Sequence, residues 1–236
     1  MNISNKLRVN LLWITLFSVA MGFLECAVVV YLRAIYFPGG FEFPMVPISD
    51  AHIPTELGRE LATLVMLIGI GILAGKDAWS RFAIFIYSFA IWDIFYYIFL
   101  KVLLNWPESI MTWDILFLIP TVWTGPVLAP VVSSVTMIFL TLIILLKGSD
   151  MKAGGWTIGL LITGAVIQII SYTWDFSIFL HKHDSMEALF NLFKFSEISF
   201  SYIPKHFPWG IFITGEILIL FSTWLIFSGK ELFKKV

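Results

Sequence analysis

Hydrophobic positions run through this chain in six long segments with short polar stretches between them. The segments cover about 9–36, 56–74, 82–104, 113–146, 156–180 and 207–228. A helix rises about 1.5 Å per residue, so about 20 apolar residues cross the roughly 30 Å hydrocarbon core of a membrane. The pattern therefore predicts an all-α, polytopic membrane protein, a bundle of six transmembrane helices in a lipid bilayer. We expect residues 1–236 to form a single integral membrane domain.

The composition excludes an ordinary soluble domain. Hydrophobic residues make up 59% of the chain, charged residues only 13%, and the mean hydropathy is +0.90. A soluble domain carries about 25% charged residues. Cys26 is the only cysteine, which excludes an internal disulfide and a cysteine-based zinc or iron–sulfur site. The net charge of -1 says nothing about nucleic acid, and no basic cluster suggests a nucleic-acid partner.

Basic residues gather on one side of the predicted membrane. The nine that do so are Lys6, Arg8, Lys76, Arg81, Lys147, Lys152, Lys230, Lys234 and Lys235. By the positive-inside rule this side is cytoplasmic. We therefore expect a protein of the plasma membrane or of a bacterial inner membrane, with both termini in the cytoplasm. All four histidines and 13 of the 16 acidic residues then fall in outer loops or within spans. A carboxylate in hydrocarbon is costly, so this asymmetry predicts an outward-facing polar site.

The fourth span is too long for a single straight helix. Residues 113–146 would extend about 51 Å as a helix, against a core of about 30 Å. The first half of the span contains Pro120, Gly125, Pro126 and Pro130. Proline removes a backbone donor and clashes with the preceding turn, so we expect a Pro/Gly-broken span, with either a kink that absorbs the excess length or a re-entrant segment.

Two outer loops are long enough to carry structure of their own. Residues 38–55 are rich in proline and glycine, which favours an ordered flap over a helix. Residues 184–193 begin with a passable capping box, Asp-Ser-Met-Glu, and continue with mainly apolar residues. They predict a short amphipathic helix in the outer interface.

Polar side chains line one face of three spans, at the helical spacing of three and four residues. Span two carries Glu56, Arg59, Glu60 and Thr63; span three carries Asp93, Tyr96, Tyr97 and Lys101; span five carries Gln168, Ser171, Tyr172 and Asp175. Such faces turn toward neighbouring helices, because lipid leaves polar groups unsatisfied. Glu25 in span one and Glu216 in span six join them near mid-depth. The cytoplasmic halves offer only small hydroxyls, Tyr87 and glycines, so the predicted site opens outward over an apolar floor.

Acids outnumber bases in this region. Seven carboxyl groups lie within or at the ends of the spans, against three basic side chains. Three ion pairs are available as packing contacts alone: Glu56–Arg59, Asp93–Lys101 and Glu25–Arg33. About four carboxyl groups then remain without a basic partner, and each must be protonated, bound to a metal ion or in contact with water.

Depth and residue type divide the candidates by role. The deepest acids, Glu25, Asp93 and Glu216, are candidate catalytic or proton-relay residues, and desolvation predicts that at least one of them is neutral near pH 7. The residues predicted to bind a ligand or cation around them are Glu56, Arg59, Glu60, Tyr96, Tyr97, Lys101 and Asp175.

A divalent metal is the candidate cofactor. Its predicted ligands are Glu60, Asp93, His181, His183 and His206, because carboxylate and imidazole groups together suit Zn, Mn or Fe. Each histidine on its own is more often a solvated interfacial residue. The sequence contains no HExxH motif and no other catalytic or nucleotide-binding signature that would name a reaction.

The sequence thus favours a multi-pass membrane protein with an outward-opening, carboxylate-rich intramembrane site that binds a metal cation or handles protons. Such a site suits an intramembrane enzyme or a subunit of a redox complex. One alternative is a proton- or cation-coupled transporter, whose inner gate would be the small residues of the cytoplasmic halves. The other is a structural or docking subunit, whose outer acids meet other membrane subunits or an extracytoplasmic protein.

Overall fold

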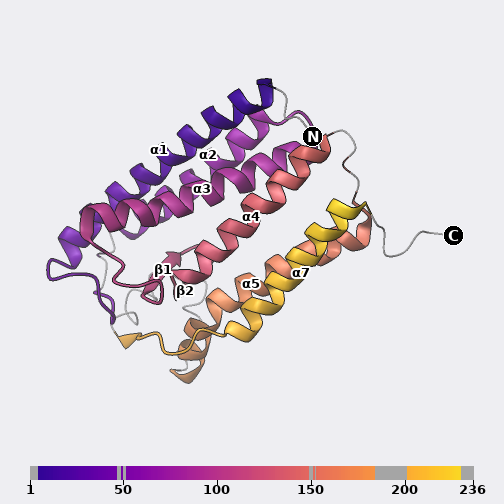
Figure 1. Ribbon diagram of the computed structural model, residues 1–236. Coiled ribbons are helices and arrows are strands. Elements are labelled where there is room, and N and C mark those ends of the chain that lie inside the picture. Colours follow the sequence, from indigo (N-terminus) through magenta and orange to yellow (C-terminus); the bar gives the residue numbers. More distant parts are fainter. Residues whose placement is uncertain are drawn as a thin grey trace.

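The computed structural model describes residues 5–46, 49, 52–148, 151, 153–183 and 201–229. Within these residues, six helices are long and apolar enough to cross a membrane. They are α1 (Asn5–Tyr36), α2 (Ile53–Ala74), α3 (Ala78–Leu104), α4 (Leu128–Lys147), α5 (Gly155–Lys182) and α7 (Trp209–Ser228). The predicted all-α six-helix class is confirmed (Figure 1). The predicted interfacial helix at 184–193 lies outside the described residues.

The fourth span differs most from the expectation. Its first part is an antiparallel hairpin of β1 (Trp113–Phe117) and β2 (Trp123–Pro126), in which Trp113 pairs with Pro126. Only the remaining 20 residues form the helix α4, whose length of about 30 Å matches a hydrocarbon core. The sequence correctly placed the break, but the broken segment is a hairpin and not a kinked helix.

Helices α2 and α3 begin earlier than their apolar runs, each for a local reason. Helix α2 starts at Ile53, with Pro54 in the first turn, where a missing backbone donor costs nothing. Helix α3 starts at Ala78 behind the N-cap Asp77, whose carboxylate accepts the Ser80 N–H at 3.0 Å. This hydrogen bond holds the pKa of Asp77 below its usual range. A first-turn proline in α2 and a capping side chain in α3 thus mark helix starts that precede the hydrophobic pattern.

The helices form two groups (Figure 1). In the first, α3 packs against α1, α2 and α4; in the second, α5 packs against α7. Helix α4 meets α7, and β2 meets α5, so the hairpin joins the two groups. We call the end of the bundle that carries the hairpin the hairpin end, and the opposite end, where α3 and α5 begin, the terminal end. The sequence-based orientation predicts that the hairpin end faces out.

The pair α5–α7 is held at close range by two glycines. A Cβ atom added to Gly164 would lie 2.8 Å from the Gly215 carbonyl oxygen, and one added to Gly215 would lie 2.7 Å from the Gly164 carbonyl oxygen. Small residues at such a crossing let two backbones approach within a membrane.

An apolar cluster fills the bundle near the terminal end. It contains Ala83, Ile86, Leu140, Ile143, Ile144, Met151 and Ile226, from α3, α4, α7 and the segment before α5. This cluster forms the apolar floor that the sequence predicted beneath the polar residues.

Candidate functional site

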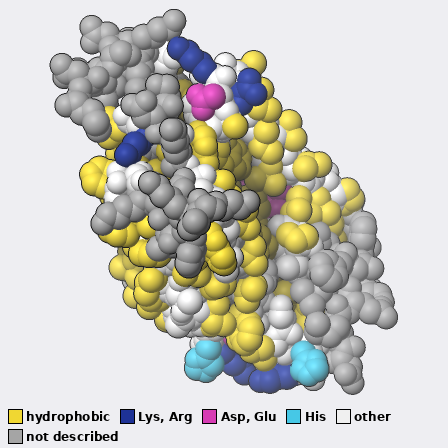
Figure 2. Space-filling model, turned by 90° about the vertical axis from the view of Figure 1, so that its right-hand side faces the viewer, with side chains coloured by type: hydrophobic (Ala, Val, Ile, Leu, Met, Phe, Trp, Pro, Cys, Tyr) yellow, Lys and Arg dark blue, Asp and Glu magenta, His cyan; other side chains and the backbone are white. Residues whose placement is uncertain are grey.

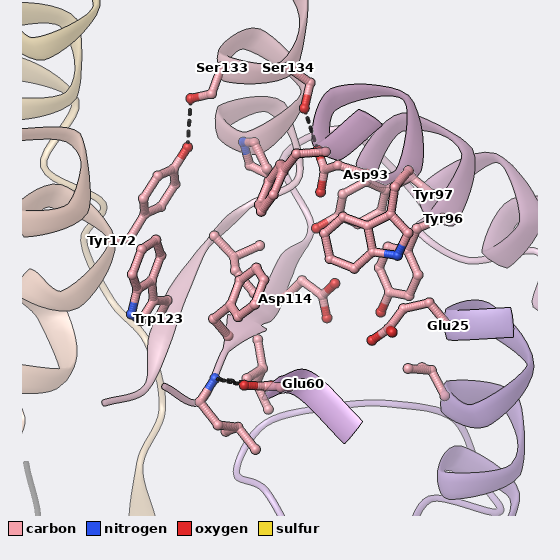
Figure 3. Close-up of a pocket in the computed structure, with 18 of the residues that line it drawn as sticks. Glu25, Glu60, Asp93, Tyr96, Tyr97, Asp114, Trp123, Ser133, Ser134 and Tyr172 are labelled. Carbon is pink, nitrogen blue, oxygen red and sulfur yellow. Dashed lines mark hydrogen bonds between the residues drawn. The ribbon is translucent and has the colours of Figure 1, made fainter. Parts of the chain in front are cut away.

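A cavity of about 400 Å³ is lined by residues from the hairpin end to past the middle of the bundle. Figure 3 shows part of its lining. All six described helices and both strands contribute to its lining. Its acidic residues are Glu25, Glu56, Glu60, Asp93, Asp114 and Glu216. The polar faces that the sequence predicted on α2 and α3 thus meet in one place, together with Gln168 and Tyr172 of α5.

Arg59 is surrounded by three carboxylates. Its guanidinium contacts Glu25 of α1 and Glu56 of its own helix, where Nε lies 2.9 Å from Glu56 Oε1. Glu60 Oε1 lies 3.9 Å from Arg59 Nη2. The predicted Glu56–Arg59 pair is therefore present, whereas Glu25 pairs with Arg59 and not with Arg33.

Arg33 pairs with an acid of the hairpin instead. Its Nη2 lies 3.4 Å from Asp114 Oδ1, and the two residues are only 8% and 2% exposed. The guanidinium carbon also lies 3.8 Å from the ring centroid of Trp106 and 4.4 Å from that of Phe41.

Glu60 fastens the hairpin to α2. Both of its carboxylate oxygens accept the backbone N–H of Leu118, at 3.1 and 3.0 Å, in the turn between β1 and β2. Glu60 thus contacts Arg59 and at the same time holds the hairpin in position (Figure 3).

Asp93 has no basic partner among the described residues. Its Oδ2 accepts a hydrogen bond from the Ser134 hydroxyl of α4 at 2.8 Å. The Asp93–Lys101 packing pair that the sequence made available does not form, because Lys101 Nζ donates to the carbonyls of Asn105 and Pro107 at 3.2 and 3.0 Å. Lys101 is exposed beyond the cavity and closes the end of α3.

Glu216 is held by two neutral donors. The Thr136 hydroxyl of α4 donates to Oε1, and the Gln168 side-chain amide of α5 donates to Oε2. No basic side chain of the described residues pairs with this buried carboxyl group. Glu216 therefore joins α7 to α4 and α5 through hydrogen bonds alone.

Aromatic rings form much of the cavity wall. The rings of Trp123 and Tyr172 stack with centroids 5.9 Å apart and an interplanar angle of 12°. The Tyr172 hydroxyl lies 3.0 Å from Ser133 Oγ. On the other side of the cavity, Tyr96 and Tyr97 meet edge to face at 5.0 Å, near Asp93 and Glu25 (Figure 3).

Five predicted site residues do not line the cavity: Lys101, Asp175, His181, His183 and His206. Asp175 instead fixes the segment before α7, because it accepts hydrogen bonds from the Tyr202 hydroxyl at 3.1 Å and from the backbone N–H of His206 at 3.2 Å. His183 Nδ1 bonds the Phe179 carbonyl at 2.8 Å.

The metal ligands predicted from the sequence do not lie together in the structure. Glu60 and Asp93 line the cavity, and the three histidines stand outside it. Within the described part of the chain, no group of three or more His, Cys, Asp or Glu side chains is arranged to hold a metal ion. Histidines in loops are usually interfacial residues, and these three follow that tendency.

The cavity keeps the predicted excess of acid. It has six carboxyl groups against two guanidinium groups, an excess of four. It also contains buried donors without a hydrogen-bond partner, namely Arg33 Nη1, Trp92 Nε1 and Trp123 Nε1. Water or ligand oxygen atoms are the usual partners of such groups.

Comparisons with protein-family models, with curated proteins and with solved structures find no match. The six apolar helices fit a multi-pass membrane protein, and the function must be argued from the cavity itself.

Proposed function

We propose that the protein binds an organic cation in this cavity and exchanges protons for it. The observation that carries the proposal is the excess of four carboxyl groups over guanidinium groups in a space of about 400 Å³. A buried carboxylate without a counter-charge costs several kcal/mol. A cation or a proton must therefore balance each of these groups, and the two compete.

The size and walls of the cavity favour an organic cation over a metal ion. Ligand pockets for organic molecules enclose about 300–1,000 Å³ behind mainly apolar walls. The faces of tyrosine and tryptophan rings attract cations, and they recognise quaternary ammonium groups in particular. Trp92, Tyr96, Tyr97 and Trp123 line the cavity beside Asp93. A divalent metal would instead require several carboxylate or histidine ligands at one point.

The unpaired donors do not reverse this conclusion. An unsatisfied buried N–H group costs about 1–3 kcal/mol, and a single water molecule removes that cost. An uncompensated carboxylate costs more, and there are four in excess. Charge therefore decides the class of ligand, while the tryptophan N–H groups of the wall can bind water or an oxygen atom of the ligand.

The position of the floor supports a site that is used from one side. Ile86 and Leu140 line the cavity and also belong to the apolar cluster near the terminal end. A transport pathway needs polar lining on both sides of its central site. Together with the sequence-based orientation, the floor closes the cavity toward the cytoplasmic side, which favours a one-sided site, as in an intramembrane enzyme or a redox subunit, over alternating access.

The test is a titration of the protein with tetramethylammonium, a cation that cannot lose its charge. In phosphatidylcholine nanodiscs, isothermal calorimetry should show saturable binding, and Asp93→Asn should weaken it about tenfold or more, equivalent to about 1.4 kcal/mol. The neutral isostere 3,3-dimethyl-1-butanol should not bind. Glu108→Gln is the matched control, because Glu108 is exposed and lies outside the cavity.

Two results would contradict the proposal. One is an Asp93→Asn protein that binds tetramethylammonium as tightly as the unaltered protein does. The other is a protein that ignores tetramethylammonium and binds one equivalent of Zn, Mn or Fe, which would return the site to the metal interpretation.

A further inference from the structure

The cavity has a polar part and an apolar part at different depths. Its apolar limb consists of Phe85, Ile86, Phe89, Met137, Leu140 and Ile219. On α3, Ile86 lies about 10 Å closer to the terminal end than Asp93, and on α4 Leu140 lies about 9 Å beyond Ser134. Most of the carboxyl groups thus lie toward the hairpin end of an elongated space, and hydrocarbon side chains surround its other end. Glu216, which is hydrogen-bonded to Thr136 and Gln168, lies between the two parts.

The cavity also reaches the lipid-facing flank. Among its lining residues only Ala165 and Ile169 are exposed, and Ile169 is 40% exposed. Both lie on α5, and Ile169 is about 20 Å from either end of that helix. The mouth formed by Ala165 and Ile169 therefore opens near the middle of the membrane, far from either aqueous surface.

The packing of α5 explains why an opening exists there. Helix α5 packs against α7 and β2, whereas α4 packs against α3 and α7. The two helix groups are thus joined at α4–α7 and at the hairpin, which leaves the flank beside the middle of α5 uncovered. Figure 2 shows an acidic side chain inside a hollow of a predominantly hydrophobic flank.

We infer that the ligand is an amphiphile with a cationic head and a hydrocarbon chain, and that it reaches the cavity sideways from the bilayer through the mouth. This inference rests on the proposed cation binding. The head lies among the carboxylates and aromatic rings, where charge and ring faces match it. The chain lies in the apolar limb and leaves through the mouth into hydrocarbon of the same polarity. A water-borne cation would need neither the limb nor the mouth.

The experiment compares dodecyltrimethylammonium with tetramethylammonium on the full chain in phosphatidylcholine nanodiscs. Ile169→Trp narrows the mouth, and Ile170→Trp is its control, because Ile170 is 41% exposed and does not line the cavity. Stopped-flow binding of the dodecyl compound should slow at least about tenfold in Ile169→Trp, and remain unchanged in Ile170→Trp. Membrane partitioning of the probe is the same for both variants, so it cancels.

A second pair of variants protects the test against a folding defect. Ala165→Phe should slow the dodecyl compound as Ile169→Trp does, whereas Val166→Phe, at an exposed position outside the cavity, should not. Tetramethylammonium should bind the two control variants, Ile170→Trp and Val166→Phe, as tightly as the unaltered protein, and Ile169→Trp and Ala165→Phe should retain saturable binding of it. Equal rates of dodecyl binding in Ile169→Trp, Ala165→Phe and the unaltered protein would overturn the lateral route while leaving cation binding intact. If tetramethylammonium itself fails to bind, the proposed function falls, and the inference falls with it.

Discussion

Glu60 of α2 accepts the backbone N–H of Leu118 with both carboxylate oxygens, at 3.1 and 3.0 Å. This contact fixes the turn of the hairpin, and the hairpin in turn supplies Asp114 and Trp123 to the cavity. A single charged side chain thus connects the polar face of a helix to the position of a segment more than fifty residues further along the chain.

Loss of this contact should loosen the hairpin. A hydrogen bond to a charged group contributes about 1.5–3 kcal/mol, and its removal leaves the Leu118 N–H without a partner. Glu60→Ala should therefore lower the free energy of unfolding by about that amount, measured by thermal or denaturant unfolding in detergent. Glu60→Gln keeps an acceptor and should lose less. Glu108→Ala is the exposed control, expected within about 0.5 kcal/mol of the unaltered protein. Equal stability of Glu60→Ala and this control would contradict the role of Glu60.

Arg59 should be essential to folding near neutral pH. Its removal leaves Glu25, Glu56 and Glu60 close together without their guanidinium, and such a broken buried pair costs about 3–5 kcal/mol. Arg59→Gln should be destabilised by about this amount at pH 7. The defect should shrink as the pH falls, because protonation removes the repulsion among the carboxylates.

Two further variants separate the charge of Arg59 from its geometry. Arg59→Lys keeps one charge but not the planar fork that reaches several carboxylates, so it should rescue only part of the stability. Lys182→Gln removes an exposed charge outside the cavity and should behave like the unaltered protein. An Arg59→Gln defect that is independent of pH would show that charge compensation is not its cause.

The glycine contact between α5 and α7 gives a prediction with a control on the same helix. In Gly164→Ala the new Cβ would lie 2.8 Å from a backbone oxygen of α7, and overpacking of this kind costs about 1–3 kcal/mol. Gly159 on α5 has nothing within 4 Å of its added Cβ, so Gly159→Ala should be neutral or slightly stabilising. Unfolding of both variants in detergent measures the difference. A Gly164→Ala protein as stable as Gly159→Ala would mean that the two helices can separate at no cost.

The sequence predicted the helices well because their signal is local. Apolar runs of sufficient length identify membrane-spanning helices, and the polar spacing on α2 and α3 identified the faces that line the cavity. Glu25 and Glu216, which were assigned to the same site from their depth alone, also line it. Helix periodicity and depth therefore recover most of the acidic residues of the cavity.

The partners of these residues could not be predicted, because they depend on how helices face one another. Glu25 pairs with Arg59, and Arg33 pairs with Asp114, whereas the sequence offered Glu25–Arg33 as an available packing pair. Asp114 was missed as a site residue because residues 113–126 have the hydrophobicity of a membrane helix, and only their prolines and glycine indicated a break. The role of Lys101 followed from the carbonyl groups at the end of α3, which no spacing rule identifies.

Infrared difference spectroscopy with and without tetramethylammonium tests the central claim most directly. If the cation displaces protons from the excess carboxyl groups, its addition should remove the carbonyl band of protonated carboxyl groups and increase the carboxylate bands. The change should be smaller in Glu216→Gln and in Asp93→Asn, and it should be unaltered in Glu108→Gln. Saturation of the signal should follow the calorimetric binding curve. A protein that binds tetramethylammonium with no loss of the protonated carbonyl band, or one that shows no spectral change at any concentration, would contradict the exchange of protons for an organic cation in this cavity.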